Sequence, residues 1–231
     1  MTAIEKQGYA ARQAARQLAV TATADKDRAL EAIAQALLAR QGEVLSANAA
    51  DLEAGRQAGL SQALLDRLAL SEQRIAGIVE GVRQVAALPD PVGEETRRDT
   101  LKSGLVLTRR RVPLGVIGII YEARPNVTVD AAVLCLKAGN AVILRGGKEA
   151  YRSNTALMAI MRDAVEAAGL PRDSLALVAD TSRSSASELM NLTEYLDVLI
   201  PRGGAGLIRS VTANARVPVI RTGEGVCHIY V

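Results

Sequence analysis

Apolar side chains recur at helical spacing through the first 92 residues. They fall three or four positions apart, as at Leu30, Ile33 and Leu37, in a background rich in Ala, Gln, Arg and Glu, which is the pattern of amphipathic helices. Glycines and Ser71 interrupt this pattern where helix ends and N-caps are expected. We therefore predict four or five helices between residues 2 and 88.

The pattern changes between residues 93 and 112. Leu105 and Leu107 alternate with Val106 and Thr108, and arginine clusters lie on both sides. Ser103 and Gly104 supply a turn between the two halves. We predict an exposed two-stranded hairpin over residues 97–111. The charged residues at its ends would keep other strands from pairing with its edges.

Residues 113–231 repeat a different order: an apolar β-branched run, a turn, an amphipathic helix and another apolar run. This order is typical of an α/β fold with a parallel sheet. The expected strands are 115–120, 141–144, 175–178, 198–200, 217–220 and 227–231. The expected helices include 127–137 and 154–168.

Two of the predicted strands end in the same tripeptide, Arg-Gly-Gly, just before a helix. In an open parallel sheet ligands bind beyond the carboxyl ends of the strands. Glycines let the backbone approach an anion, while main-chain N–H groups and arginine or lysine attract it. We therefore expect a phosphate-bearing ligand at these corners. Their residues are Arg145, Gly146, Gly147 and Lys148 after one strand and Pro201, Arg202, Gly203 and Gly204 after the other.

A third polar turn follows the first core strand. Glu122, Arg124 and Asn126 crowd this loop. Their spacing fits ion pairing with neighbours as well as it fits a ligand contact, so the spacing alone leaves their role open.

Composition narrows the class of protein. The chain has 231 residues, of which 49% are apolar, with no Phe or Trp, so an aliphatic core between helices and a parallel sheet is expected. The formal net charge is only +3, and no aromatic residues interleave with the arginine clusters to stack bases. We expect no nucleic-acid partner.

The ends and the apolar runs indicate a cytoplasmic protein with no membrane partner. The longest apolar run, 112–121, contains Pro113 and Gly115 and is about half the length of a membrane span. The N-terminus lacks a basic region followed by an apolar one, so no secretory signal is expected. Two distant cysteines do not form a disulfide framework.

No nucleophile or metal site emerges from the motifs. Cys227 and His228 are adjacent, so on a strand their side chains point to opposite faces, and Cys135 lies in an apolar helical run like a small hydrophobic residue. There is no zinc-like spacing and no G-x-S-x-G motif. Neither the G-x-G-x-x-G nor the G-x-x-x-x-G-K-[ST] fingerprint occurs.

Four segments together carry a resemblance. They are LGVIGIIYEARPN at 114–126, KAGNAVILRGGKEA at 137–150, IPRGG at 200–204 and TGEGVCHIYV at 222–231. In this order they resemble the γ-glutamyl phosphate reductase (glutamate-5-semialdehyde dehydrogenase) family of the aldehyde dehydrogenase superfamily. The resemblance implies a Rossmann-like sheet that binds its nucleotide without the usual glycine fingerprint.

The resemblance also implies roles for the turns, with NADPH as the hydride donor. Residues 145–148 would hold the adenosine ribose and its phosphate, residues 201–204 would lie near the pyrophosphate, and Arg124 and Asn126 would lie near the reacting centre. Residues 1–92 would be the helical part of the cofactor domain, 93–112 an oligomerisation arm and 113–231 the NADP-binding core. A homo-oligomer through the 97–111 hairpin is implied, and glutamate 5-kinase, which supplies the substrate, is a candidate partner.

The implied reaction has three steps. A cysteine thiolate displaces phosphate from L-glutamyl 5-phosphate, NADPH reduces the thioester, and the thiohemiacetal collapses to L-glutamate 5-semialdehyde. The family's cysteine falls beyond Val231, so we expect this chain to be a fragment without its own nucleophile. Two alternatives stay open: a non-catalytic nucleotide- or phosphate-binding protein, and another acyl-phosphate or acyl-CoA reductase of the superfamily.

Overall fold

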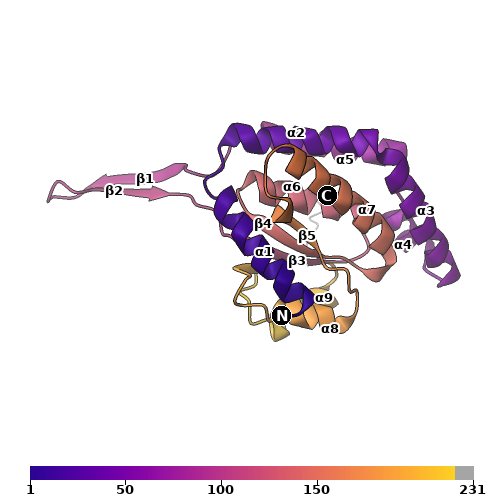
Figure 1. Cartoon of the computed structure of the whole chain (residues 1–231). Coiled ribbons are helices and arrows are strands. Elements are labelled where there is room, and N and C mark those ends of the chain that lie inside the picture. The colour runs from indigo at the N-terminus through magenta and orange to yellow at the C-terminus, as the bar shows by residue number, and fades with distance from the viewer. Residues whose placement is uncertain (222–231) are drawn as a thin grey trace, which may run out of the picture.

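The computed structural model describes residues 1–221, and five helices occupy the first 87 of them (Figure 1). This confirms the prediction of four or five helices. Thr2 begins the first with a capping box to Glu5, and Ser61 and Ser71 cap the fourth and fifth through their hydroxyls. The five are α1 (Ala3–Leu18), α2 (Thr23–Ala39), α3 (Gln41–Gln57), α4 (Gln62–Leu68) and α5 (Glu72–Ala87).

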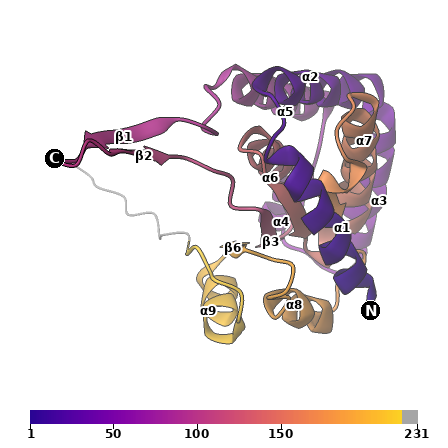
Figure 2. The ribbon, with the colours of Figure 1, turned by 60° about the vertical axis from the view of Figure 1, so that its left-hand side comes forward.

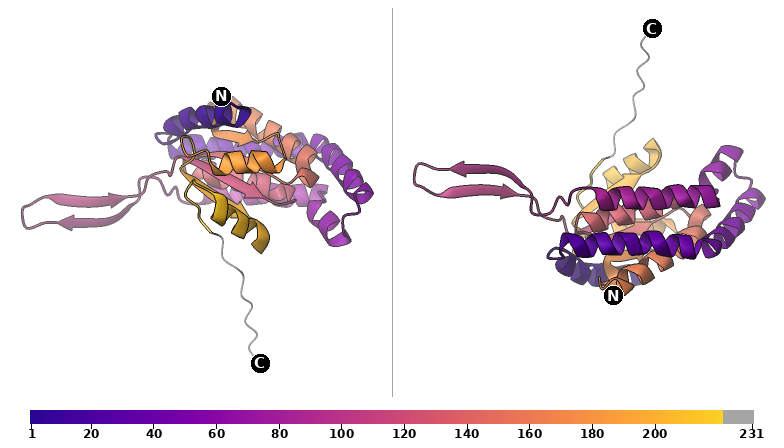
Figure 3. Two further views of the ribbon diagram at one scale, coloured as in Figure 1. Left: turned by 90° about the horizontal axis from the view of Figure 1, so that it is seen from below. Right: turned by 90° about the horizontal axis from the view of Figure 1, so that it is seen from above.

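The predicted hairpin is present and projects far from the body of the protein (Figure 3). Its strands are β1 (Glu95–Thr100) and β2 (Val106–Arg110), paired antiparallel. Gly104 turns the chain between them with φ 85°, a conformation that costs glycine little. Neither strand contributes a residue to the buried core of the described chain.

A parallel sheet of four strands forms the centre of the described structure, in the order β5-β4-β3-β6. Each strand is mostly buried, because helices cover both faces. The strands are β3 (Val116–Tyr121), β4 (Ala141–Arg145), β5 (Leu175–Leu177) and β6 (Val198–Arg202). The predicted α/β class with a parallel sheet is confirmed.

Helices lie in layers on the two faces of this sheet (Figure 2). On one face lie α6 (Pro125–Lys137) and α7 (Tyr151–Ala167), which α2, α3 and α5 cover in turn. On the other face lie α1, α8 (Arg183–Met190) and α9 (Ala205–Asn214). The short helices η1 (Lys148–Ala150) and η2 (Arg172–Ser174) precede α7 and β5. One hydrophobic cluster runs from Ile4 through the sheet to Val217, so the N-terminal helices and the sheet share a core.

The expected strand at 217–220 is wrong. Only Val219 pairs with the sheet, in a single parallel bridge to Leu199 of β6. The Pro218 carbonyl accepts from Leu199 N and the Ile220 amide donates to the Leu199 carbonyl. Pro218 has no N–H, so it cannot donate the bond that would extend this pairing toward the start of β6. The expected strand at 227–231, with Cys227 and His228, lies outside the described residues.

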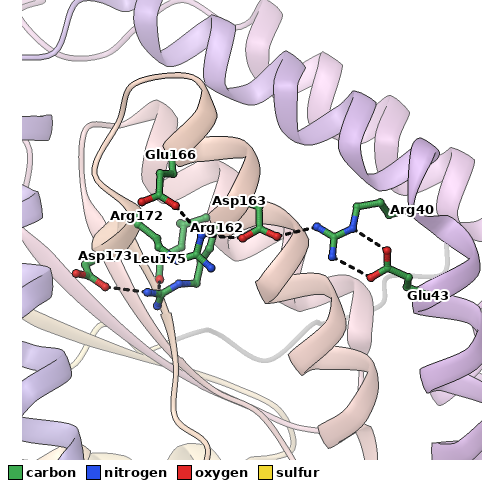
Figure 4. A network of polar contacts seen from close by, with 8 residues as sticks. All are labelled: Arg40, Glu43, Arg162, Asp163, Glu166, Arg172, Asp173 and Leu175. Atoms are coloured by element: carbon green, nitrogen blue, oxygen red, sulfur yellow. Dashed lines mark hydrogen bonds and ion pairs between the residues drawn. The ribbon is translucent and has the colours of Figure 1, made fainter.

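Ion pairs on the surface join the α2–α3 junction to α7 and η2 (Figure 4). Arg40 binds both carboxylate oxygens of Glu43 at 2.8 and 2.9 Å and also donates to Asp163 at 2.7 Å. Arg172 donates to the other oxygen of Asp163 at 2.7 Å. These hydrogen bonds from Arg40 and Arg172 lower the pKa of Asp163. All four side chains are at least a third exposed, so the network contributes little to stability.

Two polar clusters are buried. The Asp51 carboxylate of α3 accepts from the amide and hydroxyl of Ser153 at 2.8 and 2.7 Å, at the N-terminus of α7. Beside it, Asn48 donates to Leu68 O and accepts from Leu70 N. In the second cluster the ammonium of Lys26, which is fully buried, lies 2.5 Å from the Asp90 carboxylate. These clusters fix the α4–α5 connection and the segment that leads to the hairpin.

Candidate functional site

The two Arg-Gly-Gly corners lie on either side of one strand end. In the register of the sheet Ile120 of β3 pairs with Arg145 of β4, and Tyr121 pairs with Arg202 of β6. The chain leaves β3 toward β4 and later returns to β3's other side as β6. The strand order therefore reverses here, where open α/β sheets bind their ligands.

Two adjoining clefts occupy this point, and they share Tyr121, Glu122 and Arg124 as lining residues. One has a volume of about 330 Å³ and is lined by Arg145, Gly147 and Glu149 of the β4 corner. The other is about 220 Å³ and is lined by Arg202, Gly203 and Gly204 of the β6 corner. The structure thus brings the two corners together around the third polar turn.

The β4 corner rests on a buried chain of hydrogen bonds. The Tyr121 hydroxyl lies 2.7 Å from the Thr128 hydroxyl, which donates to the Asn154 carbonyl oxygen at 2.9 Å. Burial raises the pKa of Tyr121, so the phenol stays neutral. A Cβ on Gly146 would lie 2.4 Å from the Asn154 amide nitrogen. Only glycine lets the corner pack against this chain.

Arg145 is anchored by carbonyl groups. Its guanidinium donates to the carbonyls of Thr181 and Ser182 at 2.6 and 2.8 Å, in the loop before α8. Desolvation lowers the pKa of Arg145, although Asp180 and Glu149 oppose the shift. The cation therefore lies fixed at the cleft wall. Lys148, the other basic residue of this corner, begins η1 with its side chain exposed.

At the β6 corner a carboxylate of the protein itself occupies the anion-binding position. Gly204 is the N-cap of α9, and its amide donates to Glu122 Oε1 at 3.1 Å. The Glu122 side chain also packs against Gly203, where a Cβ would lie 2.6 Å from its carboxyl carbon. A helix N-terminus attracts negative charge. The corner is therefore built for an anion, and Glu122 supplies one.

Removing this carboxylate is expected to strengthen anion binding. In Glu122→Ala the Gly204 amide is free and a negative charge is gone, so inorganic pyrophosphate should bind about threefold to tenfold more tightly at low ionic strength. Isothermal titration of the wild type, Glu122→Ala and the exposed control Glu80→Ala measures this. A weaker affinity in Glu122→Ala would instead make Glu122 a ligand contact, one of the two roles that its spacing left open.

Arg124 and Asn126 lie at the start of α6, where Arg124 is the N-cap and Pro125 the first helical residue. Asn126 Nδ2 donates to Asp130 at 3.1 Å. Both residues line a third cleft of about 500 Å³ between α4, α5 and α6. Arg67 of α4 also lines all three clefts. Sequence patterns did not single out Arg67, because it lies in an ordinary amphipathic helix and only the fold brings it to these clefts.

Among residues 1–221 we find neither a reactive thiol nor a cluster of metal-binding side chains. Burial raises the pKa of Cys135 to about 12, so this thiol stays protonated and unreactive. No group of three His, Cys, Asp or Glu side chains in this range could hold a metal ion. No helix in the same range is long and apolar enough to cross a membrane.

Comparison with known proteins gives consistent relatives. The model of the aldehyde dehydrogenase family matches residues 2–221. A γ-glutamyl phosphate reductase of Heliobacterium modesticaldum is 58% identical over 97% of this chain and 54% of its own length. One of Moorella thermoacetica is 58% identical over 99% of this chain and 54% of its own length. The chain spans about half the length of the curated relatives it matches.

Solved structures agree with the sequences. The crystal structure of a γ-glutamyl phosphate reductase from Thermotoga maritima superposes with a TM-score of 0.93 at 43% identity, covering 95% of this chain and 53% of that one. The corresponding structure from Saccharomyces cerevisiae gives a TM-score of 0.89 at 31% identity, over 95% and 56% of the two chains.

Proposed function

Because this chain belongs to the aldehyde dehydrogenase family, we propose that it forms the NADPH-binding portion of an enzyme that reduces L-glutamyl 5-phosphate. The products are L-glutamate 5-semialdehyde and phosphate, in proline biosynthesis. One observation carries the proposal: two Arg-Gly-Gly corners open onto adjoining clefts at the reversal point of the sheet. The γ-glutamyl phosphate reductase relatives supply the substrate class.

The residues present fit an anionic dinucleotide. A Cβ on Gly203 would lie 2.6 Å from the Glu122 carboxyl carbon and would displace that side chain, and the Gly204 amide donates to the same carboxylate. We propose that Arg145, Gly146, Gly147 and Lys148 hold the adenosine ribose and its phosphate, and that Pro201, Arg202, Gly203 and Gly204 lie along the pyrophosphate. When bound, NADPH supplies the hydride. The chain's own part is to bind and orient the cofactor.

Lys148 is the residue with which we test this assignment. We expect wild-type protein to bind NADPH more tightly than NADH in isothermal titration, because only NADPH carries the ribose phosphate. Lys148→Glu should weaken NADPH binding about thirtyfold while NADH binding changes little, since the variant places a negative charge beside that phosphate. Lys102→Glu, in the exposed hairpin turn, is the matched control.

The outcomes separate two questions. Failure of the wild type to bind either nucleotide would refute the proposed function. If Lys148→Glu lowered the affinities for NADPH and NADH equally, the proposed function would stand, but Lys148 would not contact the ribose phosphate.

The hairpin supports a second proposal, a homo-oligomer formed through residues 97–111. Its exposed side chains include the apolar Leu101, Leu105 and Leu107, which solvent alone does not favour on an isolated arm. A purely monomeric protein at micromolar concentration in analytical ultracentrifugation would contradict this. Glutamate 5-kinase, as supplier of the unstable acyl phosphate, stays a candidate partner.

A further inference from the structure

The largest of the three clefts carries charges of both signs. It lies between α4, α5 and α6, has a volume of about 500 Å³, and has a partly apolar lining that includes Leu70 and Ile78. The ionic side chains in its wall are Asp66, Arg67, Arg74, Arg124 and Asp130. The Arg-Gly-Gly corners do not line this cleft, so it is a place for a second ligand.

Two of its arginines are available to bind a ligand. In the described part of the chain, the guanidinium groups of Arg67 and Arg124 make no hydrogen bond or ion pair, and both side chains are exposed. Arg74, in contrast, is held in place. It donates to the carbonyls of Asp66 and Ala69 and to the Asp66 carboxylate at 2.7 Å. A free carboxylate therefore finds its donors on Arg67 and Arg124.

Both aspartates keep one oxygen for a ligand. Asp66 accepts from Arg74 through Oδ1, and Asp130 accepts from the Asn126 amide through Oδ2. Among residues 1–221 the second oxygen of each has no hydrogen-bond partner. Two carboxylates, each with one oxygen unpaired, thus line the same cleft as two unpaired guanidinium groups.

This charge pattern selects the ligand. A dianion would be repelled by the two aspartates, and a simple cation would be repelled by the arginines. A zwitterion satisfies both sets. Resting on the proposed function, we propose that this cleft binds the α-ammonium and α-carboxylate of the amino-acid substrate, with Arg67 and Arg124 on the carboxylate and Asp66 and Asp130 facing the ammonium.

The position of the cleft fits this role. Arg67 and Arg124 line it and also line both cofactor clefts. A substrate whose head group is held by these two arginines therefore lies beside the cofactor. The cleft would then bind an α-amino acid more tightly than the corresponding acid that lacks the amino group.

The test compares two small ligands on the full chain without cofactor. The probes are L-glutamate and glutarate, which differ by the α-ammonium group, and NMR titration measures their affinities. We expect wild-type protein to bind L-glutamate about tenfold more tightly. Asp130→Asn should lose most of this preference by weakening L-glutamate and not glutarate. Arg67→Met should weaken both about tenfold, since both carry the carboxylate. Arg16→Met, exposed on α1, is the control.

Equal wild-type affinity for the two ligands would overturn the inference, as would an equal loss of both in Asp130→Asn. NADPH titration of the same wild-type protein reports on the proposed function separately. If NADPH binds and L-glutamate shows no preference, the zwitterion site fails alone. If L-glutamate is preferred and NADPH does not bind, the cofactor assignment fails and the cleft stands.

Discussion

Asp51→Ala is expected to lower the free energy of unfolding by about 3 kcal/mol, because it leaves buried donors without an acceptor. The Asp51 side chain is 1% exposed. It accepts from the Ser153 amide and hydroxyl and from the Arg152 amide. These amides belong to the first turn of α7, which has no capping side chain of its own. Urea unfolding followed by circular dichroism measures the change.

Asp163→Ala is the control, since it also removes a helical carboxylate, but one of α7 that belongs to the exposed network of Figure 4. It should cost no more than about 1 kcal/mol. If both variants lost a similar free energy of unfolding, burial of Asp51 would not explain its contribution to stability. The cluster also supports the cleft between α4, α5 and α6. Asn48 donates to Ser153 and binds the backbone at 68–70, and Ala69 and Leu70 of that segment line the cleft.

The second large effect is expected from Lys26→Met, which should destabilise the fold by about 3–4 kcal/mol at pH 7. The variant leaves the Asp90 carboxylate, 10% exposed, without its counter-ion. Thr23 and the Val92 amide would still donate to it, at 2.7 and 2.9 Å. In Lys26→Met/Asp90→Asn the unpaired charge is gone, so most of the loss should be recovered.

The pH dependence of Lys26→Met has a definite sign. In the wild type burial alone would raise the pKa of Asp90, but hydrogen bonds from Lys26, Thr23 and Val92 lower it below its ordinary value. The stability it contributes is present above the unfolded pKa of about 3.9 and is lost as pH falls through the lower folded value. Without Lys26 burial prevails, so stability should rise as pH falls from 7 toward 4. A variant whose stability falls over that range would contradict this account.

The sequence was sufficient for the elements that periodicity encodes. Apolar β-branched runs predicted β3, β4, β5 and β6, and the glycine turns between strands and helices predicted both corners. Helix starts were less exact: α6 begins at Pro125 rather than at 127 because proline suits the first helical position. At 217–220 only Val219 pairs with the sheet, and Pro218 in this apolar run cannot donate to a ladder.

What sequence patterns could not supply were contacts between distant segments. Glu122 accepts from the Gly204 amide, 82 residues away. No local sequence pattern predicts this contact. Arg67 of α4 and Asp130 of α6 line one cleft, although they are far apart in the sequence. On its own helix each residue looks like an ordinary solvated charge. Only the folded structure shows that a positive and a negative side chain line the same cleft.

The hairpin has a consequence for how the molecule tolerates change. Its strands add nothing to the core, while the segment that leads into it is pinned by Lys26 to Asp90, and Lys137 fastens Asp27 and the Ala86 carbonyl nearby. The hairpin is therefore attached through a segment held by ion pairs, while its own strands contribute nothing to the core. Substitutions on its surface should therefore change the melting temperature little.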